Sequence, residues 1–252
     1  MVRSVWWMNV EMLRTQLTCA HRARTFTLAE LLVVVAIMAL LIAILLPSLG
    51  KARKQAKATV CMSNLRGLGL AVRMYSMVNE DRLVTAGLGH GSSGNPQGAW
   101  INLLRREYHD ELLLRCPADK SPHWQTPLAP HNLLRRVSYA NNWYTVDRVG
   151  GKGPFNRFGL FVRPQTTVYI VDLAEKGPFA VADHIHPETW FSNPAVIAPK
   201  QIAIKRHLGK ANYSFIDTHI ERLRFDQTYQ LDPGGGFPPR FIHNMYDPAI
   251  GR

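Results

Sequence analysis

The chain has 252 residues, a length that suits one medium-sized domain with an added element. Hydrophobic residues make up 46% and charged residues 19%, which excludes a largely disordered protein. The formal net charge of +12 allows binding to nucleic acid, anionic lipid or acidic polysaccharide, but the Lys and Arg residues are scattered through the soluble part. This pattern indicates a generally basic surface, and no specific nucleic-acid partner is predicted.

Residues 26–49 are predicted to form a membrane helix. They contain a single charge, Glu30, and residues 31–46 are an unbroken apolar run. At about 1.5 Å per residue such a helix reaches roughly 36 Å, which is enough to cross a hydrocarbon core of about 30 Å. A buried helix of a soluble protein seldom needs so long an apolar run without a polar face.

Two interpretations of this segment compete. A secretory signal peptide has a shorter apolar region followed by a small-x-small cleavage site, and Ser48-Leu49-Gly50 qualifies as such a site. Against a signal peptide stand the length of the run and the position of Glu30 near its start. A carboxylate inside a membrane helix is costly, which makes Glu30 a candidate functional residue.

The residues from Thr25 to Ala36 resemble the cleavage and methylation motif of type IV prepilins and type II secretion pseudopilins. That motif is a small residue, then Phe-Thr-Leu-x-Glu, then an apolar helix, and residues 25–30 read Thr-Phe-Thr-Leu-Ala-Glu. The resemblance implies that residues 1–25 are a leader and that a prepilin peptidase cuts before Phe26 and methylates its new amine. The family prefers Gly before the cut, where this chain has Thr25.

The resemblance also implies assembly roles for Glu30 and Pro47. In a packed filament Glu30 would pair with the N-terminal amine of a neighbouring subunit, which satisfies two costly charges and sets axial register. Pro47 lies where pilin helices commonly carry a proline, and it removes an amide donor from the helix. Because basic residues flank the helix on both sides, charge alone does not orient it. The motif implies a bacterial inner-membrane protein with a cytoplasmic N-terminus and a periplasmic or extracellular C-terminal domain.

Residues 50–80 are predicted to continue the helix, as an amphipathic segment packed on a globular domain. Apolar residues recur there at steps of four, three, four and three: Cys61, Leu65, Leu68, Val72 and Tyr75. A free-standing coiled coil is the alternative, although fewer than four clean heptads are present.

Cys61 and Cys116 can form a disulfide if this part of the chain is exported. The loop between them has roughly 55 residues, for which the chain-entropy model assigns about 4 kcal/mol. Two buried free thiols are the alternative.

Residues 81–225 are predicted to form an α+β domain, and the whole to be pilin-like: a long N-terminal helix on a small, mainly antiparallel sheet. Gly87 to Gly98 is a loop, and residues 102–114 are expected to form a short helix. Strands are expected at residues 167–172, 179–182, 202–204 and 212–216, the last continuing through a hairpin into residues 219–223. Thr218 occupies a turn position that tolerates its side chain poorly. Residues 226–252 are expected to be an irregular tail.

Separate patches of the chain resemble a subgroup of prepilin-like proteins with a C-terminal H-x9-D-G signature. His207 and Asp217 match the H-x9-D part, and Thr218 replaces the Gly. Structural hydrogen bonding is the expected role of both residues. A metal site is the alternative, since alternate residues of a strand share a face; its candidates are Asp183, His184, His186, His207, Asp217 and His219. No familiar zinc or calcium spacing supports such a site, so no metal and no cofactor are predicted.

The sequence contains no recognisable catalytic set of a nucleophile, a histidine and an acidic residue, and no phosphate-binding loop. An enzyme is therefore not expected. The leading hypothesis is a non-catalytic pseudopilin or minor pilin that polymerises through its N-terminal helix. Its expected partners are prepilin peptidase, other pilin or pseudopilin subunits and inner-membrane lipid. The alternative is a membrane-anchored module that binds acidic glycan or DNA outside the cytoplasm, and an anchored hydrolase is a third, weaker hypothesis.

Overall fold

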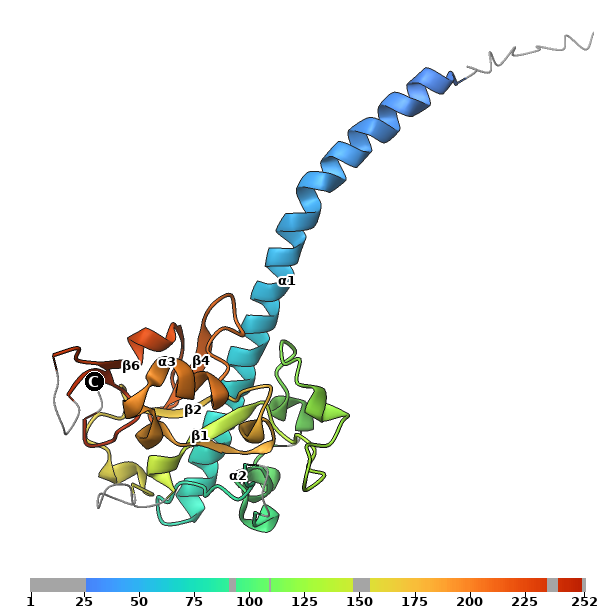
Figure 1. Ribbon diagram of the computed structural model, residues 1–252. Coiled ribbons are helices and arrows are strands. Elements are labelled where there is room, and N and C mark those ends of the chain that lie inside the picture. The colour runs from blue at the N-terminus through green and yellow to red at the C-terminus, as the bar shows by residue number, and fades with distance from the viewer. Residues whose placement is uncertain (1–25, 91–93, 109, 147–154, 235–239, 251–252) are drawn as a thin grey trace, which may run out of the picture. The chain divides into compact units, whose positions relative to one another are not determined.

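The computed structural model describes residues 26–90, 94–108, 110–146, 155–234 and 240–250 (Figure 1). The chain divides into two compact units, Met1–Pro47 and Ser48–Arg252. The proposed leader, residues 1–25 with Thr25, lies outside the described residues.

A single helix, α1 (Leu28–Val78), runs from the first unit into the second. In the first unit every described side chain is exposed, although nearly all of them are apolar. This part of α1 is long and apolar enough to cross a membrane. The expectation of one long N-terminal helix that continues beyond Pro47 is confirmed.

The second unit is built on a five-stranded mixed sheet in the order β3-β1-β2-β4-β5. Its strands are β1 (Tyr139–Asn142), β2 (Val168–Asp172), β3 (His184–Ile185), β4 (Ala211–Phe215) and β5 (Ile220–Leu223). Strand β3 pairs with β1 in parallel, and the other three pairings are antiparallel. The expected α+β class is therefore confirmed.

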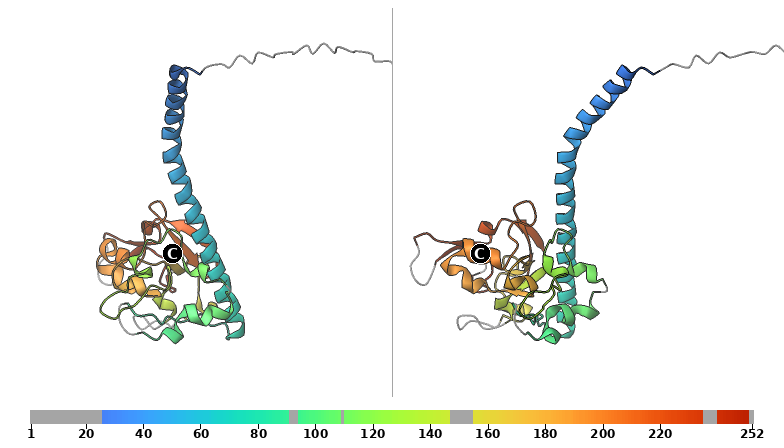
Figure 2. Two further views of the ribbon diagram at one scale, coloured as in Figure 1. Left: turned by 90° about the vertical axis from the view of Figure 1, so that its right-hand side faces the viewer. Right: turned by 45° about the vertical axis from the view of Figure 1, so that its right-hand side comes forward.

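The C-terminal part of α1 lies against one face of this sheet (Figures 1 and 2). The predicted apolar stripe is the contact surface: Cys61, Leu65, Leu68 and Val72 are buried, and Tyr75 packs at the margin. The stripe meets Tyr139 of β1 and Tyr169 of β2 in one core cluster. Gly69 also faces the sheet domain, where a Cβ would meet Thr218 and Ser214 at ordinary van der Waals distance, 3.4–3.5 Å.

A second core cluster fills the opposite face of the sheet. Val168 and Val171 of β2 belong to it, whereas Ile170 belongs to the α1 side, because a register irregularity between Val168 and Ile170 breaks the strict alternation of the strand. Trp190 is fully buried there and makes an edge contact with Tyr246, the ring centroids being 4.8 Å apart. The sheet is thus buried on both faces.

The structure differs from the predicted elements in four places. Residues 179–181 belong to the 3-10 helix Pro178–Val181 rather than to a strand, and Ala182 is its C-cap; Pro178 occupies the first position of this helix, after Gly177 with φ 77°. Residues 202–204 form only an isolated bridge, between Ile202 and Leu173. Residues 102–114 break into short helical turns instead of one helix. The fourth difference is the C-terminal segment.

The expected irregular tail contains a two-stranded antiparallel sheet, β6 (Tyr229–Leu231) with β7 (Phe241–Asn244). Tyr229 and Tyr246 are buried in the second core cluster, so the segment is part of the domain. Two further α-helices lie in the described part of this unit, α2 (Trp100–Leu103) and α3 (Pro194–Ile197). Short 3-10 helices connect the elements: Pro96–Gly98, Leu104–Arg106, Glu111–Leu114, Pro122–Trp124, Trp143–Thr145, Phe158–Leu160, Pro178–Val181, Pro187–Ser192, Ala198–Lys200 and Phe225–Gln227.

Candidate functional site

The first turn of α1 carries the residues of the prepilin-like motif. Thr27 precedes the helix and Glu30 is its third residue, and the two form a reciprocal capping box. The Glu30 backbone N–H donates to Thr27 Oγ1 at 3.2 Å, and Glu30 Oε2 accepts from the Thr27 N–H at 2.9 Å. The Thr27 hydroxyl also donates to Glu30 Oε2 at 2.9 Å.

The two carboxylate oxygens of Glu30 differ in their hydrogen bonds. Oε2 takes all of its bonds from Thr27, while Oε1 has no partner among residues 26–90 or the other described ranges. Phe26 lies immediately before the capping box, with 70% of its surface exposed. The geometry therefore explains how Glu30 helps to start the helix and leaves one carboxylate oxygen for an external donor.

Pro47 is the last residue of the first unit and lies inside α1. It has no N–H to donate to the carbonyl of Ala43, so one bond of the helical ladder is missing there. The α-helix nevertheless continues through this position to Val78.

Cys61 and Cys116 are joined by a disulfide in the core of the second unit. Both residues are fully buried, and the bond ties α1 to the segment that leads into β1. Two buried free thiols, the alternative interpretation, are not what the structure contains.

A buried ionic network lies beside the disulfide. Asp119 Oδ2 accepts from Arg135 Nε at 2.8 Å and from the Ser138 hydroxyl at 2.7 Å, and the Arg206 NH2 group lies 3.7 Å away. Burial alone would raise the pKa of Asp119, but the two guanidinium groups and the hydrogen bonds outweigh it and hold that pKa below its ordinary value. Burial lowers the pKa of Arg135 to about 10, which keeps this guanidinium charged at neutral pH.

His207 belongs to this network through Asp172. Its Nε2 lies 3.3 Å from Asp172 Oδ2 and 3.6 Å from the Sγ atom of Cys116. Asp172 in turn pairs with Arg206 at 3.3 Å and accepts from the Asn212 N–H at 2.7 Å. His207 is therefore a structural residue that links strand β2 to the disulfide.

Asp217 lies elsewhere, in the turn between β4 and β5. Its Oδ1 accepts from the His219 N–H at 3.2 Å and lies 2.5 Å from His219 Nδ1. Within the described ranges no hydrogen bond or ion pair joins Asp217 to His207, so the two signature residues do not act as a pair. Thr218 adopts φ 73°, the strained conformation anticipated from its place in the turn.

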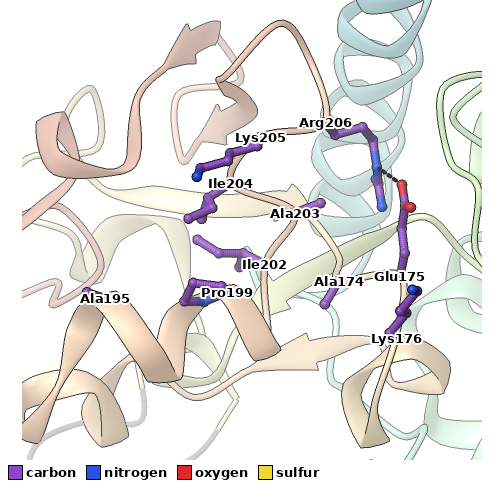
Figure 3. A pocket seen from close by; sticks show the side chains of 10 residues that line it. All are labelled: Ala174, Glu175, Lys176, Ala195, Pro199, Ile202, Ala203, Ile204, Lys205 and Arg206. Carbon is purple, nitrogen blue, oxygen red and sulfur yellow. Dashed lines mark hydrogen bonds and ion pairs between the residues drawn. The ribbon is translucent and has the colours of Figure 1, made fainter.

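A surface depression borders the buried network near Glu175 (Figure 3). Arg206 reaches one side of it, but its Nε donates to Glu175 Oε1 at 3.0 Å, so these two charges satisfy each other. The other lining residues are aliphatic or are the exposed Lys176 and Lys205. The described residues that line this depression include no Ser, Cys or His.

Three histidines converge at the edge of the sheet. His184 and His186 come from β3 and the residue after it, on one face of the chain as alternate strand residues. His90 reaches them from the loop after α1: its Nε2 lies 2.9 Å from His184 Nε2 and 2.8 Å from His186 Nε2. Burial is the main cause that lowers the pKa of His90 to about 4, and the nearby rings of His184 and His186 are a smaller one. The His90 ring is thus neutral at pH 7.

The cluster contains two of the six residues considered for a metal site, and it adds one that the sequence analysis assigned to a loop. His207 lies at the disulfide, and Asp217 and His219 lie in the β4–β5 turn. His90 was missed because it is 94 residues away from His184 and no local spacing connects them. Its only sequence signal is a lone His within a Gly- and Ser-rich loop.

Comparisons of the chain with protein-family models, with curated proteins and with solved structures find no match.

Proposed function

We propose that the chain is a non-catalytic structural subunit, a pseudopilin or minor pilin, that assembles through its N-terminal helix. The observation that carries this proposal is the first half of α1, residues 28–47, whose side chains are exposed and which has a single charge, Glu30, in its first turn. Such a surface needs lipid or other helices as its neighbours. A charge at that position is costly in lipid unless a partner satisfies it.

In this proposal the N-terminus is cytoplasmic, the first half of α1 crosses the bacterial inner membrane, and the sheet domain lies outside the cytoplasm. The Cys61–Cys116 disulfide supports an oxidising compartment for that domain. Prepilin peptidase cuts before Phe26, and Glu30 Oε1 then accepts from the new amine of a neighbouring subunit. The partners are the peptidase, other pilin-like subunits and membrane lipid.

Two variants separate the assembly role of Glu30 from its capping role. Glu30→Gln keeps the capping box, because Gln serves at the same position, but removes the charge. Thr27→Ala removes the capping hydroxyl and keeps the charge. We expect Glu30→Gln to lose helix-to-helix cross-linked oligomers in membranes, and Thr27→Ala to retain them. Wild-type oligomer levels in Glu30→Gln would refute the charge-pair mechanism.

The basic surface favours a second candidate, a membrane-anchored module that binds acidic glycan or DNA. Its support is the net charge of +12. Such binding would weaken steeply as salt rises and would be unchanged in Glu30→Gln. Retained ligand binding in a chain that never forms oligomers would favour this candidate over the first.

A further inference from the structure

We infer that His90, His184 and His186 form a binding site for a divalent transition-metal ion, Zn²⁺ in the first instance, through their Nε2 atoms. This site is separate from the N-terminal helix and does not depend on the proposed function. The three ligand nitrogens lie within 4.8 Å of one another, and among the described residues no carboxylate belongs to the group.

The hydrogen bonds on the far side of two rings fix where their lone pairs point. His184 Nδ1 lies 3.0 Å from Asp183 Oδ1, and His186 Nδ1 lies 2.7 Å from Glu188 Oε1. Because a carboxylate only accepts, each Nδ1 carries a proton, and in the neutral form of each ring Nε2 presents a lone pair. Both lone pairs face the Nε2 atom of His90.

In their neutral forms the three rings cannot satisfy one another's hydrogen bonds. A proton on His90 Nε2 can be directed at one neighbouring lone pair and leaves the other, at nearly the same distance, without a donor. A cation placed among the three nitrogens satisfies all of them together. The geometry therefore favours a metal ion over a network of hydrogen bonds.

The donors and their surroundings match a zinc site. Three neutral imidazoles with a fourth position for water are a common zinc ligand set, and ligating histidines usually donate their other N–H to a carboxylate. Tetrahedral coordination at 2.0–2.1 Å places neighbouring nitrogens about 3.3 Å apart, so His90 Nε2 needs to move about half an ångström away from each of the other two Nε2 atoms. His90 lies on a loop, and a loop can accommodate a displacement of this size.

The same carboxylate that orients His184 also anchors the loop of His90. Asp183 is fully buried and accepts from the backbone N–H groups of Gly87 and Leu88, each at 3.0 Å. Gly87 is required there, because a Cβ would lie 2.2 Å from the carbonyl oxygen of Asn95. The ligands are therefore held together before any ion binds.

Aromatic rings enclose the cluster. The Phe179 ring centroid lies 4.5 Å from that of His90, and the Trp143 centroid lies 4.6 Å from that of His184. These contacts limit the positions of the imidazoles and exclude part of the solvent. A bound ion would tie the loop after α1 to the edge strand β3, at the end of the sheet farthest in strand order from β5.

The test uses the full-length, tag-free chain extracted in detergent, stripped with a chelator and titrated with Zn²⁺. We expect about one equivalent of tightly bound zinc per chain, measured by elemental analysis after desalting and by calorimetry. His90→Ala should abolish this binding. His131→Ala is the matched control, because His131 is exposed and lies outside the cluster, and it should bind zinc like the wild type.

A second variant tests the site without removing a ligand. Glu188→Gln keeps the shape of the side chain that orients His186 and should weaken zinc affinity about 10–100-fold. Co²⁺ in place of Zn²⁺ should give the visible spectrum of a tetrahedral site in the wild type and lose it in His90→Ala, and excess Mg²⁺ should not compete. Equal zinc binding by wild type and a folded His90→Ala, or unchanged affinity in Glu188→Gln, would overturn the inference.

Discussion

The disulfide between Cys61 and Cys116 should provide a large share of the stability of the second unit. The bond closes a loop with a sequence separation of 55 residues. In the chain-entropy model, closing such a loop in the unfolded state is worth about 4 kcal/mol at 25 °C. Native domains are stable by only about 5–15 kcal/mol, so its loss should move the unfolding transition far toward lower denaturant.

The assay is chemical unfolding of the detergent-extracted chain, followed by tryptophan fluorescence, with and without reductant. The double variant Cys61→Ala/Cys116→Ala should lose about 4 kcal/mol and no longer respond to reductant. The double variant is itself the control for side effects of the reductant, because it has no disulfide to reduce. A loss of less than about 1 kcal/mol in the double variant, or an equal response of wild type and double variant to reductant, would refute the reasoning.

Two further predictions concern buried charge and backbone strain. Asp119→Asn removes the carboxylate that pairs with the buried Arg135, while Arg206 keeps Asp172 and Glu175, and should cost about 3–5 kcal/mol in the same unfolding assay. Since the folded pKa of Asp119 lies below its unfolded value of about 3.9, its contribution is complete above about pH 4 and is lost as the pH falls through the lower, folded pKa. The variant should flatten that part of the pH–stability curve, and an unchanged curve would contradict the assignment. Thr218→Gly should stabilise the domain by about 0.5–1 kcal/mol, because Gly adopts the φ of 73° without strain; a loss of stability would show that the Thr218 side chain contributes more by packing near Gly69.

The sequence predicted those helices and strands that are determined by the residue pattern of their own segment. The apolar run after Glu30 and the stripe from Cys61 to Val72 predicted α1, and β-branched and aromatic residues predicted β2 and β4. Residues 179–182 have the same β-prone character, yet Pro178 begins a helical turn there. Composition could not distinguish the two cases, because the outcome depends on the turn before the segment.

The contacts that define the sites are mostly non-local. The association of His207 with Asp172 requires the order of the strands, which periodicity does not contain. The His90 cluster requires a loop and an edge strand that are about 94 residues apart to meet. The capping box of Thr27 and Glu30 is local and has a recognisable Thr-x-x-Glu spacing, so this second role of Glu30 is readable from the sequence.

The most direct test of the proposed function is the N-terminal mass of the membrane-extracted protein, with peptides that cover residues 1–60. The proposal predicts a mature chain that begins at Phe26 and carries a methyl group on its amine. A chain cut after Gly50 would identify a secreted protein that has lost the helix. An intact leader would leave a permanently anchored domain. Either result would contradict assembly through a processed N-terminal helix.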